Sequence, residues 1–153
     1  MPDIIRARAN DFVSLCEIYS KEYGSLTEAR IRSYLEYNHI LLLQENAKII
    51  GGLFWFAREA PRHGLAEIED FFVAEEHRGK GYGSMLLASA IDYIKHYFEA
   101  LGYKARRIIV FTGKKNTIAR SCYEKHGFSV IAEVGDLFDD NNPEIMYGLK
   151  LSR

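Results

Sequence analysis

The chain has 153 residues, of which 48% are hydrophobic, and it carries 20 lysines and arginines against 21 aspartates and glutamates. The net charge of −1 excludes a global attraction to nucleic acid or to an anionic membrane. The length is that of one domain with a substantial core, so we expect a single domain over residues 1–153. Cys16 and Cys122 lie far apart and outside any Cys/His cluster, which predicts neither a zinc site nor a disulfide framework. The N-terminus has no signal-peptide core, and no run reaches the roughly 18 apolar residues of a membrane span, so we expect a cytoplasmic protein.

Hydrophobic periodicity and turn residues predict a series of strands and helices along the chain. The predicted strands are residues 4–9, 40–43, 48–58, 66–73, 107–112, 128–134 and 145–151. The predicted helices begin at Asn10 or Asp11, at Ser25 in a capping-box pair with Glu28, near Gly83, and at Asn116. Gly24, Gly102 and Gly127 end the first, third and fourth of these helices. The third helix has an expected inward stripe of Leu87, Ala90, Ile91, Ile94 and Phe98. The order βααβββαβαββ predicts a mixed sheet with helices on its faces.

Three glycines lie between the strand over residues 66–73 and the long helix, in the segment RGKGYG of residues 78–83. Glycine permits a tight turn at positive φ, which is one sufficient reason for its presence. Such a turn also points backbone N–H groups at one spot, beside the positive end of the helix dipole, and so favours an anion. A dinucleotide fingerprint would need glycine at Ser84, and a Walker A loop would need lysine at Tyr82. The spacing therefore supports neither.

The turn does match RxxGxG, formed by Arg78, Gly81 and Gly83 at a strand-to-helix junction. This resembles the pyrophosphate-binding loop of the GNAT superfamily, the acetyl-coenzyme A dependent N-acetyltransferases. The order of elements resembles the same fold along essentially the whole chain, and the specific part runs from Glu67 to Phe128. The resemblance implies an α/β (α+β) fold with a mixed, mostly antiparallel sheet of about seven strands and helices on both faces. It also implies acetyl-CoA as co-substrate and no metal.

By this resemblance, the amides of residues 79–84 hold the pyrophosphate of coenzyme A, and Arg78 and Lys80 add positive charge. The strand end at residues 71–73 would pair with the extended pantetheine arm through its backbone, and an N–H near Val73 would polarise the thioester carbonyl. Phe71 and Phe72 are also typical core or wall residues. The coenzyme-binding residues that we predict are Phe71, Phe72, Val73, Arg78, Gly79, Lys80, Gly81, Tyr82, Gly83, Ser84, Asn116 and Tyr123.

The attacking amine needs a base, because a lysine-like amine of pKa about 10.4 is mostly protonated at neutral pH. Alternation along the strand puts Glu67 and Glu69 on one face and Asp70 on the other. Glu69 is our candidate base, acting through a water, and Glu67 is the alternative. The two glutamates can instead attract a cationic substrate, or simply pair with surface bases.

The departing thiolate needs a hydrogen-bond donor, for which Tyr123 is our candidate. It follows Asn116 by seven residues, the spacing at which the family carries its coenzyme-contacting asparagine and its acid tyrosine. Proton transfer from a phenol of pKa about 10 to a thiolate of about 8.5 is uphill by roughly 2 kcal/mol, so hydrogen bonding is the role we assign. Asn116 is also a good helix N-cap. Cys122 lacks a partner that would make it a nucleophile, and we expect it to be a small buried residue.

The predicted function is transfer of an acetyl group from acetyl-CoA to a primary amine by direct attack. The segments IEDFFV and RGKGYG look like those of diamine and polyamine acetyltransferases, so a small-molecule amine or polyamine is the first acceptor class. A protein N-terminus or lysine is the second. A catalytically silent CoA-binding sensor module and a purely structural domain are the alternatives of another class. We expect no nucleic-acid or membrane partner, and the sequence leaves a homodimer open.

Overall fold

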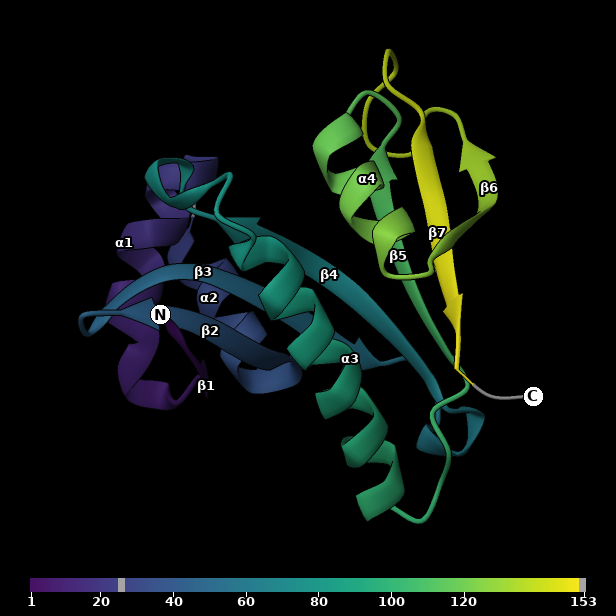
Figure 1. The fold of residues 1–153 in the computed structure, drawn as a ribbon, viewed down its shortest axis with the longest axis horizontal. Coiled ribbons are helices and arrows are strands. Elements are labelled where there is room, and N and C mark those ends of the chain that lie inside the picture. Colours follow the sequence, from purple (N-terminus) through teal and green to yellow (C-terminus); the bar gives the residue numbers. More distant parts are fainter. Residues whose placement is uncertain (25–26, 152–153) are drawn as a thin grey trace. The chain divides into compact units, whose positions relative to one another are not determined.

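A computed structural model describes residues 1–24 and 27–151 of the chain (Figure 1). The strands are β1 (Asp3–Arg6), β2 (His39–Glu45), β3 (Lys48–Ala57), β4 (Leu65–Val73), β5 (Arg107–Gly113), β6 (Ser129–Val134) and β7 (Glu144–Lys150). The α-helices are α1 (Phe12–Tyr23), α2 (Thr27–Tyr37), α3 (Tyr82–Ala100) and α4 (Thr117–Lys125). Short 3-10 turns occur at η1 (Ala9–Asp11), η2 (Pro61–His63) and η3 (Glu75–His77). The predicted order of strands and α-helices is confirmed.

The seven strands form one sheet in the order β1-β2-β3-β4-β5-β7-β6. The β1–β2, β2–β3, β5–β7 and β6–β7 pairs are antiparallel, and β4–β5 is parallel. The parallel ladder joins Leu65 to Ile68 of β4 with Arg107 to Val110 of β5. These pairings confirm the predicted α/β class and the mixed, mostly antiparallel sheet of seven strands. No helix among the described residues is long and apolar enough to cross a membrane.

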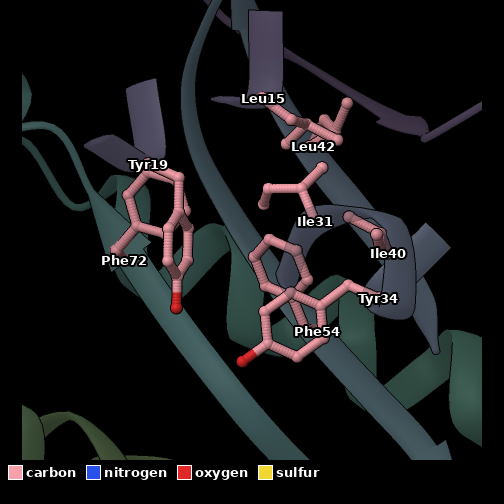
Figure 2. Packing of buried hydrophobic residues seen from close by; sticks show 8 residues of the cluster. All are labelled: Leu15, Tyr19, Ile31, Tyr34, Ile40, Leu42, Phe54 and Phe72. Atoms are coloured by element: carbon pink, nitrogen blue, oxygen red, sulfur yellow. The ribbon is translucent and has the colours of Figure 1, made fainter. Parts of the chain in front are cut away.

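The chain divides into two compact units, one of residues 1–56 and 70–90 and one of residues 57–69 and 91–153. In the first unit, side chains from α1, α2 and strands β2, β3 and β4 form one apolar cluster (Figure 2). Its buried members are Leu15, Tyr19, Ile31, Tyr34, Ile40, Leu42, Phe54 and Phe72. The sequence supplies this cluster through helical spacing in α1 and α2 and apolar runs in β2 and β3. The expectation of a single domain stays a prediction.

Two glycines of β3 allow β4 to come close in the first unit. A Cβ on Gly51 would lie 2.8 Å from the carbonyl oxygen of Phe72, and one on Gly52 would lie 3.2 Å from the Phe72 ring. Both separations are below ordinary van der Waals contact, so a side chain at either position would push β4 away. Phe72 can therefore enter the core at 6% exposure, which confirms it as a core residue.

In the second unit, β5 is the most deeply buried strand. Ile108, Ile109 and Val110 are at most 5% exposed, as their continuous apolar run predicts. Helix α3 belongs to the first unit up to Ala90 and to the second from Ile91 on, and along it the predicted residues Leu87, Ala90, Ile94 and Phe98 are fully buried, as is Leu86. Ile91, the remaining predicted member of the stripe, is half-buried.

Two predicted strand ends differ from the structure by more than one residue, and one predicted helix start cannot be compared with it. The first strand ends at Arg6 rather than at residue 9, because residues 9–11 form η1, where Asp11 Oδ2 accepts a hydrogen bond from the Arg8 N–H at 2.7 Å. The β2–β3 hairpin extends to the pair Glu45 and Lys48, since Asn46 and Ala47 make a two-residue turn at φ of 50° and 62°. The predicted capping box begins at Ser25, which lies outside the described residues.

Candidate functional site

The glycine turn of residues 78–83 reverses the chain through two positive-φ residues. Gly79 has φ of 75° and Gly81 has φ of 79°, and a Cβ on either would meet nothing within 4 Å. The backbone conformation, and not packing, therefore requires glycine at both positions. Gly83 lies inside the first turn of α3, where a Cβ would make an ordinary contact 3.6 Å from the Phe71 ring.

The helix that follows the turn presents backbone donors toward its N-terminal end. The Met85 N–H donates to the Gly81 carbonyl at 3.1 Å, so α3 closes its first hydrogen-bonded turn there. The N–H groups of Tyr82, Gly83 and Ser84 precede that bond and belong to the first turn, whose donors have no partner within their own helix. Together with the helix dipole, these donors make the turn suited to an anion.

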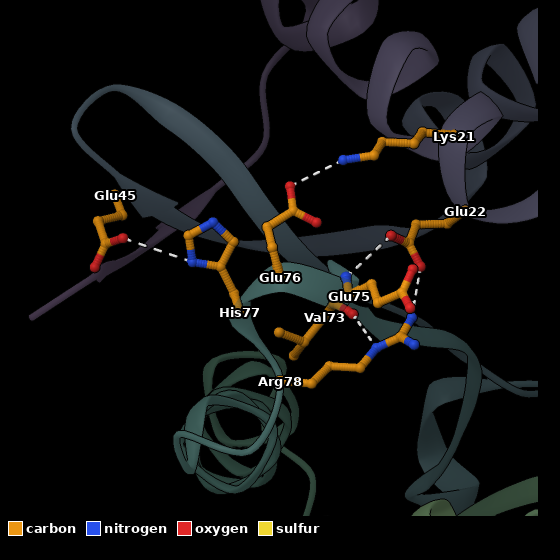
Figure 3. A network of polar contacts seen from close by, with 8 residues as sticks. All are labelled: Lys21, Glu22, Glu45, Val73, Glu75, Glu76, His77 and Arg78. Carbon is orange, nitrogen blue, oxygen red and sulfur yellow. Dashed lines mark hydrogen bonds and ion pairs between the residues drawn. The ribbon is translucent and has the colours of Figure 1, made fainter.

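Arg78, the first residue of the RxxGxG pattern, is held at both sides of its guanidinium (Figure 3). Its Nε donates to the Val73 carbonyl at 2.7 Å, and its Nη2 donates to Glu22 Oε2 at 2.6 Å. The side chain of Glu22 is 9% exposed and that of Arg78 is 53% exposed, so the carboxylate is the sheltered partner of this ion pair. Arg78 thus links the end of β4 to α1. Its predicted contribution of charge to a pyrophosphate stays a prediction, as does that of the exposed Lys80.

Strand β4 places its side chains alternately on two faces, as its period requires. Phe72 enters the aromatic core, where its ring lies 6.2 Å from that of Tyr19 and 5.8 Å from that of Tyr23. Phe71 is half-buried and faces the start of α3, because its ring is the nearest group to a Cβ built on Gly83. Val73 is also half-buried. The last five residues of β4 lie beyond the ladder with β5 that ends at Ile68.

The two glutamates of β4 have different surroundings. Glu67 pairs with Arg58, with 2.6 Å between Oε2 and Nη1, and its side chain is 15% exposed. Burial raises the pKa of Glu67 above its ordinary value, and the neighbouring Arg58 opposes that rise. Glu69 is exposed. An ion pair therefore occupies Glu67, the alternative base, while the role of Glu69 stays a prediction.

Asp70 is engaged by two tyrosines that the sequence analysis left without a role. The hydroxyl of Tyr19 donates to Asp70 Oδ2 at 2.6 Å, and that of Tyr34 donates to the same oxygen at 2.5 Å. Both rings lie in the core of Figure 2, at 2% and 4% exposure. Burial and the hydrogen bond to Asp70 raise the pKa of Tyr19 to about 12 and raise the pKa of Tyr34 as well. Both phenols therefore remain neutral donors at physiological pH.

In the second unit, Asn116 and Tyr123 lie at opposite ends of α4. Asn116 is the N-cap, and its Oδ1 accepts a hydrogen bond from the Ala119 N–H at 3.2 Å, which confirms its capping role. Tyr123 is 4% exposed, and its ring centroid lies 5.6 Å from that of Phe128 and 5.7 Å from that of Tyr147. The tyrosine is thus held in an aromatic cluster. Its role toward a thiolate stays a prediction.

A polar network that the sequence did not indicate anchors this cluster. The Tyr147 hydroxyl accepts from Arg120 Nε at 2.9 Å and donates to Glu124 Oε1 at 2.7 Å. Arg120 Nη1 also donates to the Lys114 carbonyl at 3.1 Å. The network fixes α4 to β7 and to the end of β5, and so fixes the placement of Tyr123.

The structure thus brings the predicted residues together in two groups. The end of β4, Arg78 and the glycine turn form one group in the first unit. Asn116, as the N-cap, and Tyr123 both belong to α4 in the second unit. Glu69, on β4, is also a residue of the second unit. Within the described part of the chain, no group of three or more His, Cys, Asp or Glu side chains is arranged to hold a metal ion.

Comparison with known proteins identifies the class. Residues 10–128 match the model of the acetyltransferase (GNAT) family, and the chain belongs to that family. A mycothiol acetyltransferase of Corynebacterium glutamicum is 30% identical over 105 residues, which cover 69% of this chain and 33% of that protein. The spermine/spermidine N(1)-acetyltransferase of Bacillus subtilis is 28% identical over 95 residues, covering 62% of this chain and 57% of that one. This chain therefore matches about a third and just over half of these relatives' lengths.

The fold agrees with a solved structure of the same family. A GNAT family acetyltransferase from Elizabethkingia anophelis, with acetyl-CoA bound, superposes with a TM-score of 0.76 at 22% identity. The superposition covers 98% of each chain. At this identity the likeness establishes the fold.

We predict that Asp70→Ala destabilises the protein through its two tyrosine donors. The substitution leaves the buried hydroxyls of Tyr19 and Tyr34 without their acceptor, at about 1–3 kcal/mol for each unsatisfied group. Urea denaturation should therefore show a loss of about 2–6 kcal/mol in the free energy of unfolding.

The matched control adds Tyr19→Phe and Tyr34→Phe to Asp70→Ala. Removing both donors with their acceptor is expected to restore part of the lost stability, because no buried hydroxyl then lacks a partner. A triple variant less stable than Asp70→Ala would show that the two hydroxyls have other essential partners.

Proposed function

We propose that this chain is an N-acetyltransferase that transfers the acetyl group of acetyl-CoA to a primary amine. The observation that carries the proposal is the glycine turn between β4 and α3 in a chain of the acetyltransferase (GNAT) family. Gly79 and Gly81 take positive φ and have open space where a Cβ would stand. That space, faced by the donors of the first turn of α3, fits a pyrophosphate.

The backbone of the turn supplies most of the binding in this proposal. Coenzyme A carries a pyrophosphate, whose burial requires several donors that are already in place. We assign this role to the amides of residues 79–84, which lie between the end of β4 and the first turn of α3. Lys80 is exposed beside the turn and adds positive charge. The backbone of residues 71–73, beyond the β4–β5 ladder, is the segment that we assign to the pantetheine arm.

Acetyl-CoA supplies a thioester whose carbonyl carbon is attacked by the amine nitrogen and whose sulfur leaves as a thiolate. Glu69 accepts a proton from the incoming ammonium, through a water, so that the nitrogen lone pair is available. The N–H near Val73 stabilises negative charge on the carbonyl oxygen. Tyr123 donates a hydrogen bond to the thiolate, and its burial among Phe128 and Tyr147 keeps the phenol oriented. No covalent enzyme intermediate is needed.

A small-molecule amine, with polyamines first, is the acceptor that we propose. The exposed carboxylate of Glu69 on β4 favours a cationic substrate, whereas Glu67 on the same face is already paired with Arg58. The similarity to a spermine/spermidine N(1)-acetyltransferase supports the same class. The protein N-terminus or lysine is the second acceptor class that the acceptor experiment below separates. A cytoplasmic location and a homodimer stay predictions.

The turn is tested by Gly81→Ala with Gly102→Ala as its matched control. Both glycines have positive φ, 79° and 82°, and open space around the Cβ position, so alanine meets the same backbone strain of about 1–2 kcal/mol at each. We predict equal losses of melting temperature in the two variants. Only Gly81→Ala should weaken acetyl-CoA binding, by about tenfold or more, which corresponds to at least about 1.4 kcal/mol. Equal affinity of both variants for acetyl-CoA, measured by calorimetry, would place the pyrophosphate elsewhere.

Tyr123→Phe tests the thiolate donor. Removing the hydroxyl while keeping the ring in its cluster should lower kcat by about a hundredfold, at the lower end of acid–base contributions. The dissociation constant of acetyl-CoA should stay within about twofold, because the hydroxyl acts on charge that develops in the transition state. The control Tyr103→Phe removes a hydroxyl from a residue that is 43% exposed and should change neither value. Unchanged kcat in Tyr123→Phe removes this residue from the mechanism.

The acceptor is tested by release of the coenzyme thiol from acetyl-CoA over a panel of polyamines, amino acids, aminoglycosides and peptides. We predict turnover of polyamines with the highest kcat/KM of the panel. Turnover of peptides alone would favour the protein acceptor. Absence of turnover, together with a rise in stability of about 2.7 kcal/mol at 100 times the dissociation constant of acetyl-CoA, would identify a silent binding module.

A further inference from the structure

We propose that Glu22, on α1, is a positioning residue for the donor-binding turn. Its carboxylate holds the guanidinium of Arg78 and so fixes the glycine turn against the end of β4. The inference rests on the proposed role of the turn in binding coenzyme A. It adds a residue from a helix that the RxxGxG pattern does not include.

Both oxygens of Glu22 are used at the connection between β4 and α3, as Figure 3 shows. Oε2 accepts from Arg78 Nη2 at 2.6 Å, and Oε1 accepts from the Glu75 N–H at 3.3 Å. Arg78 Nε closes the arrangement on the Val73 carbonyl at 2.7 Å. One carboxylate therefore contacts the connection at two points, and the guanidinium bridges it to the strand end.

The backbone between these points is short and already ordered. The Ala74 N–H donates to the Ile50 carbonyl at 2.8 Å, and the Arg78 N–H donates to the Glu75 carbonyl at 3.2 Å. After Arg78, neither Gly79 nor Gly81 has a side chain that could hold the turn, and the next side-chain hydrogen bond comes from Tyr82, whose hydroxyl donates to Glu45 Oε1 at 3.4 Å. The last fixed side chain before the glycines is therefore that of Arg78.

Burial of the carboxylate separates this ion pair from an ordinary surface contact. The side chains of Glu22 and Arg78 are 9% and 53% exposed, whereas those of the neighbouring pair, Lys21 and Glu76, are 63% and 54% exposed. Exposed pairs of this kind contribute about 0–1 kcal/mol. Removing the partner of a sheltered carboxylate costs much more stability, because the carboxylate's charge is then left unpaired. Lys21 and Glu22 are adjacent in sequence, so α1 itself supplies a matched control.

The ion pair between Glu22 and Arg78 predicts the direction in which the affinity for acetyl-CoA changes when Glu22 is removed. Glu22 neutralises the charge of Arg78. In this arrangement the guanidinium holds the turn in place, and the backbone amides donate the hydrogen bonds to the phosphate. Without Glu22, Arg78 no longer holds the turn, and the turn can adopt other conformations. The apparent affinity for acetyl-CoA then falls in proportion to the fraction of molecules whose turn is in the binding-competent conformation. If Arg78 were mainly a phosphate ligand, removal of the competing carboxylate would instead tighten binding.

The experiment compares Glu22→Gln with Lys21→Gln in the full chain, using calorimetry with acetyl-CoA and steady-state kinetics. For Glu22→Gln we expect the dissociation constant and KM of acetyl-CoA to rise by about tenfold, as for a competent fraction of about one tenth, with kcat within about twofold. Lys21→Gln should leave all three values unchanged. Arg78→Lys keeps the charge but lacks the planar fork that places Nε on the Val73 carbonyl and Nη2 on Glu22, so it should show the same rise as Glu22→Gln. This second variant keeps the test available if Glu22→Gln does not fold.

Unchanged or tighter binding in Glu22→Gln overturns the inference while leaving the acetyltransferase proposal intact. A fall in kcat and melting temperature without a rise in KM overturns it too, because that pattern indicates a general structural role. A wild-type protein that does not bind acetyl-CoA contradicts the proposed function itself, and with it the inference. The two failures are therefore distinguishable.

Discussion

A multiply charged pyrophosphate can be bound tightly only by donors that stand in place before it arrives, and the backbone that offers them must turn at positive φ. Gly79 and Gly81 meet this requirement directly before α3. Glycine gives the conformation but no side chain to stabilise it, so neighbouring groups must hold the turn. In the first unit that support comes from Phe72 in the aromatic core, which fixes β4, and from Arg78 between Val73 and Glu22.

Strand β4 combines structural and chemical roles because its two faces alternate. One face carries Asp70 and Phe72 into a core of aromatic rings, where two tyrosine hydroxyls satisfy the carboxylate. The half-buried Asp70 is tolerated there because it accepts both hydroxyl hydrogen bonds, so that neither the carboxylate nor the two buried hydroxyls lack a partner. The other face carries Glu67, which pairs with Arg58, and the exposed Glu69, to which we assign the attraction of a cationic acceptor. The same strand that anchors α1 and α2 thus also presents the proposed base.

Patterns in the sequence predicted those features of the fold that are set by local backbone conformation and by the burial of one face of a helix or strand. The order of elements, the Asn116 cap and the closing glycines follow from helical spacing, capping chemistry and positive φ. These patterns could not predict which residues pair across the fold. The helical spacing of Tyr19 and Tyr34 indicates a buried face, but it does not indicate that the two hydroxyls share the carboxylate of Asp70. Glu22 and Arg78 are 56 residues apart, and no local pattern joins them. Ala47 at positive φ was missed because alanine rarely occupies that region, and the first strand of the hairpin was predicted to end at residue 43, although it extends to Glu45.

The central claim is that the amides of residues 79–84 hold the pyrophosphate. Backbone amide NMR of the ¹⁵N-labelled protein, titrated with coenzyme A, tests it most directly. The account predicts that the largest shifts include the N–H resonances of Gly79, Gly81 and the first turn of α3, because a bound phosphate accepts hydrogen bonds from them. Saturable binding of coenzyme A that leaves these resonances in place would contradict it.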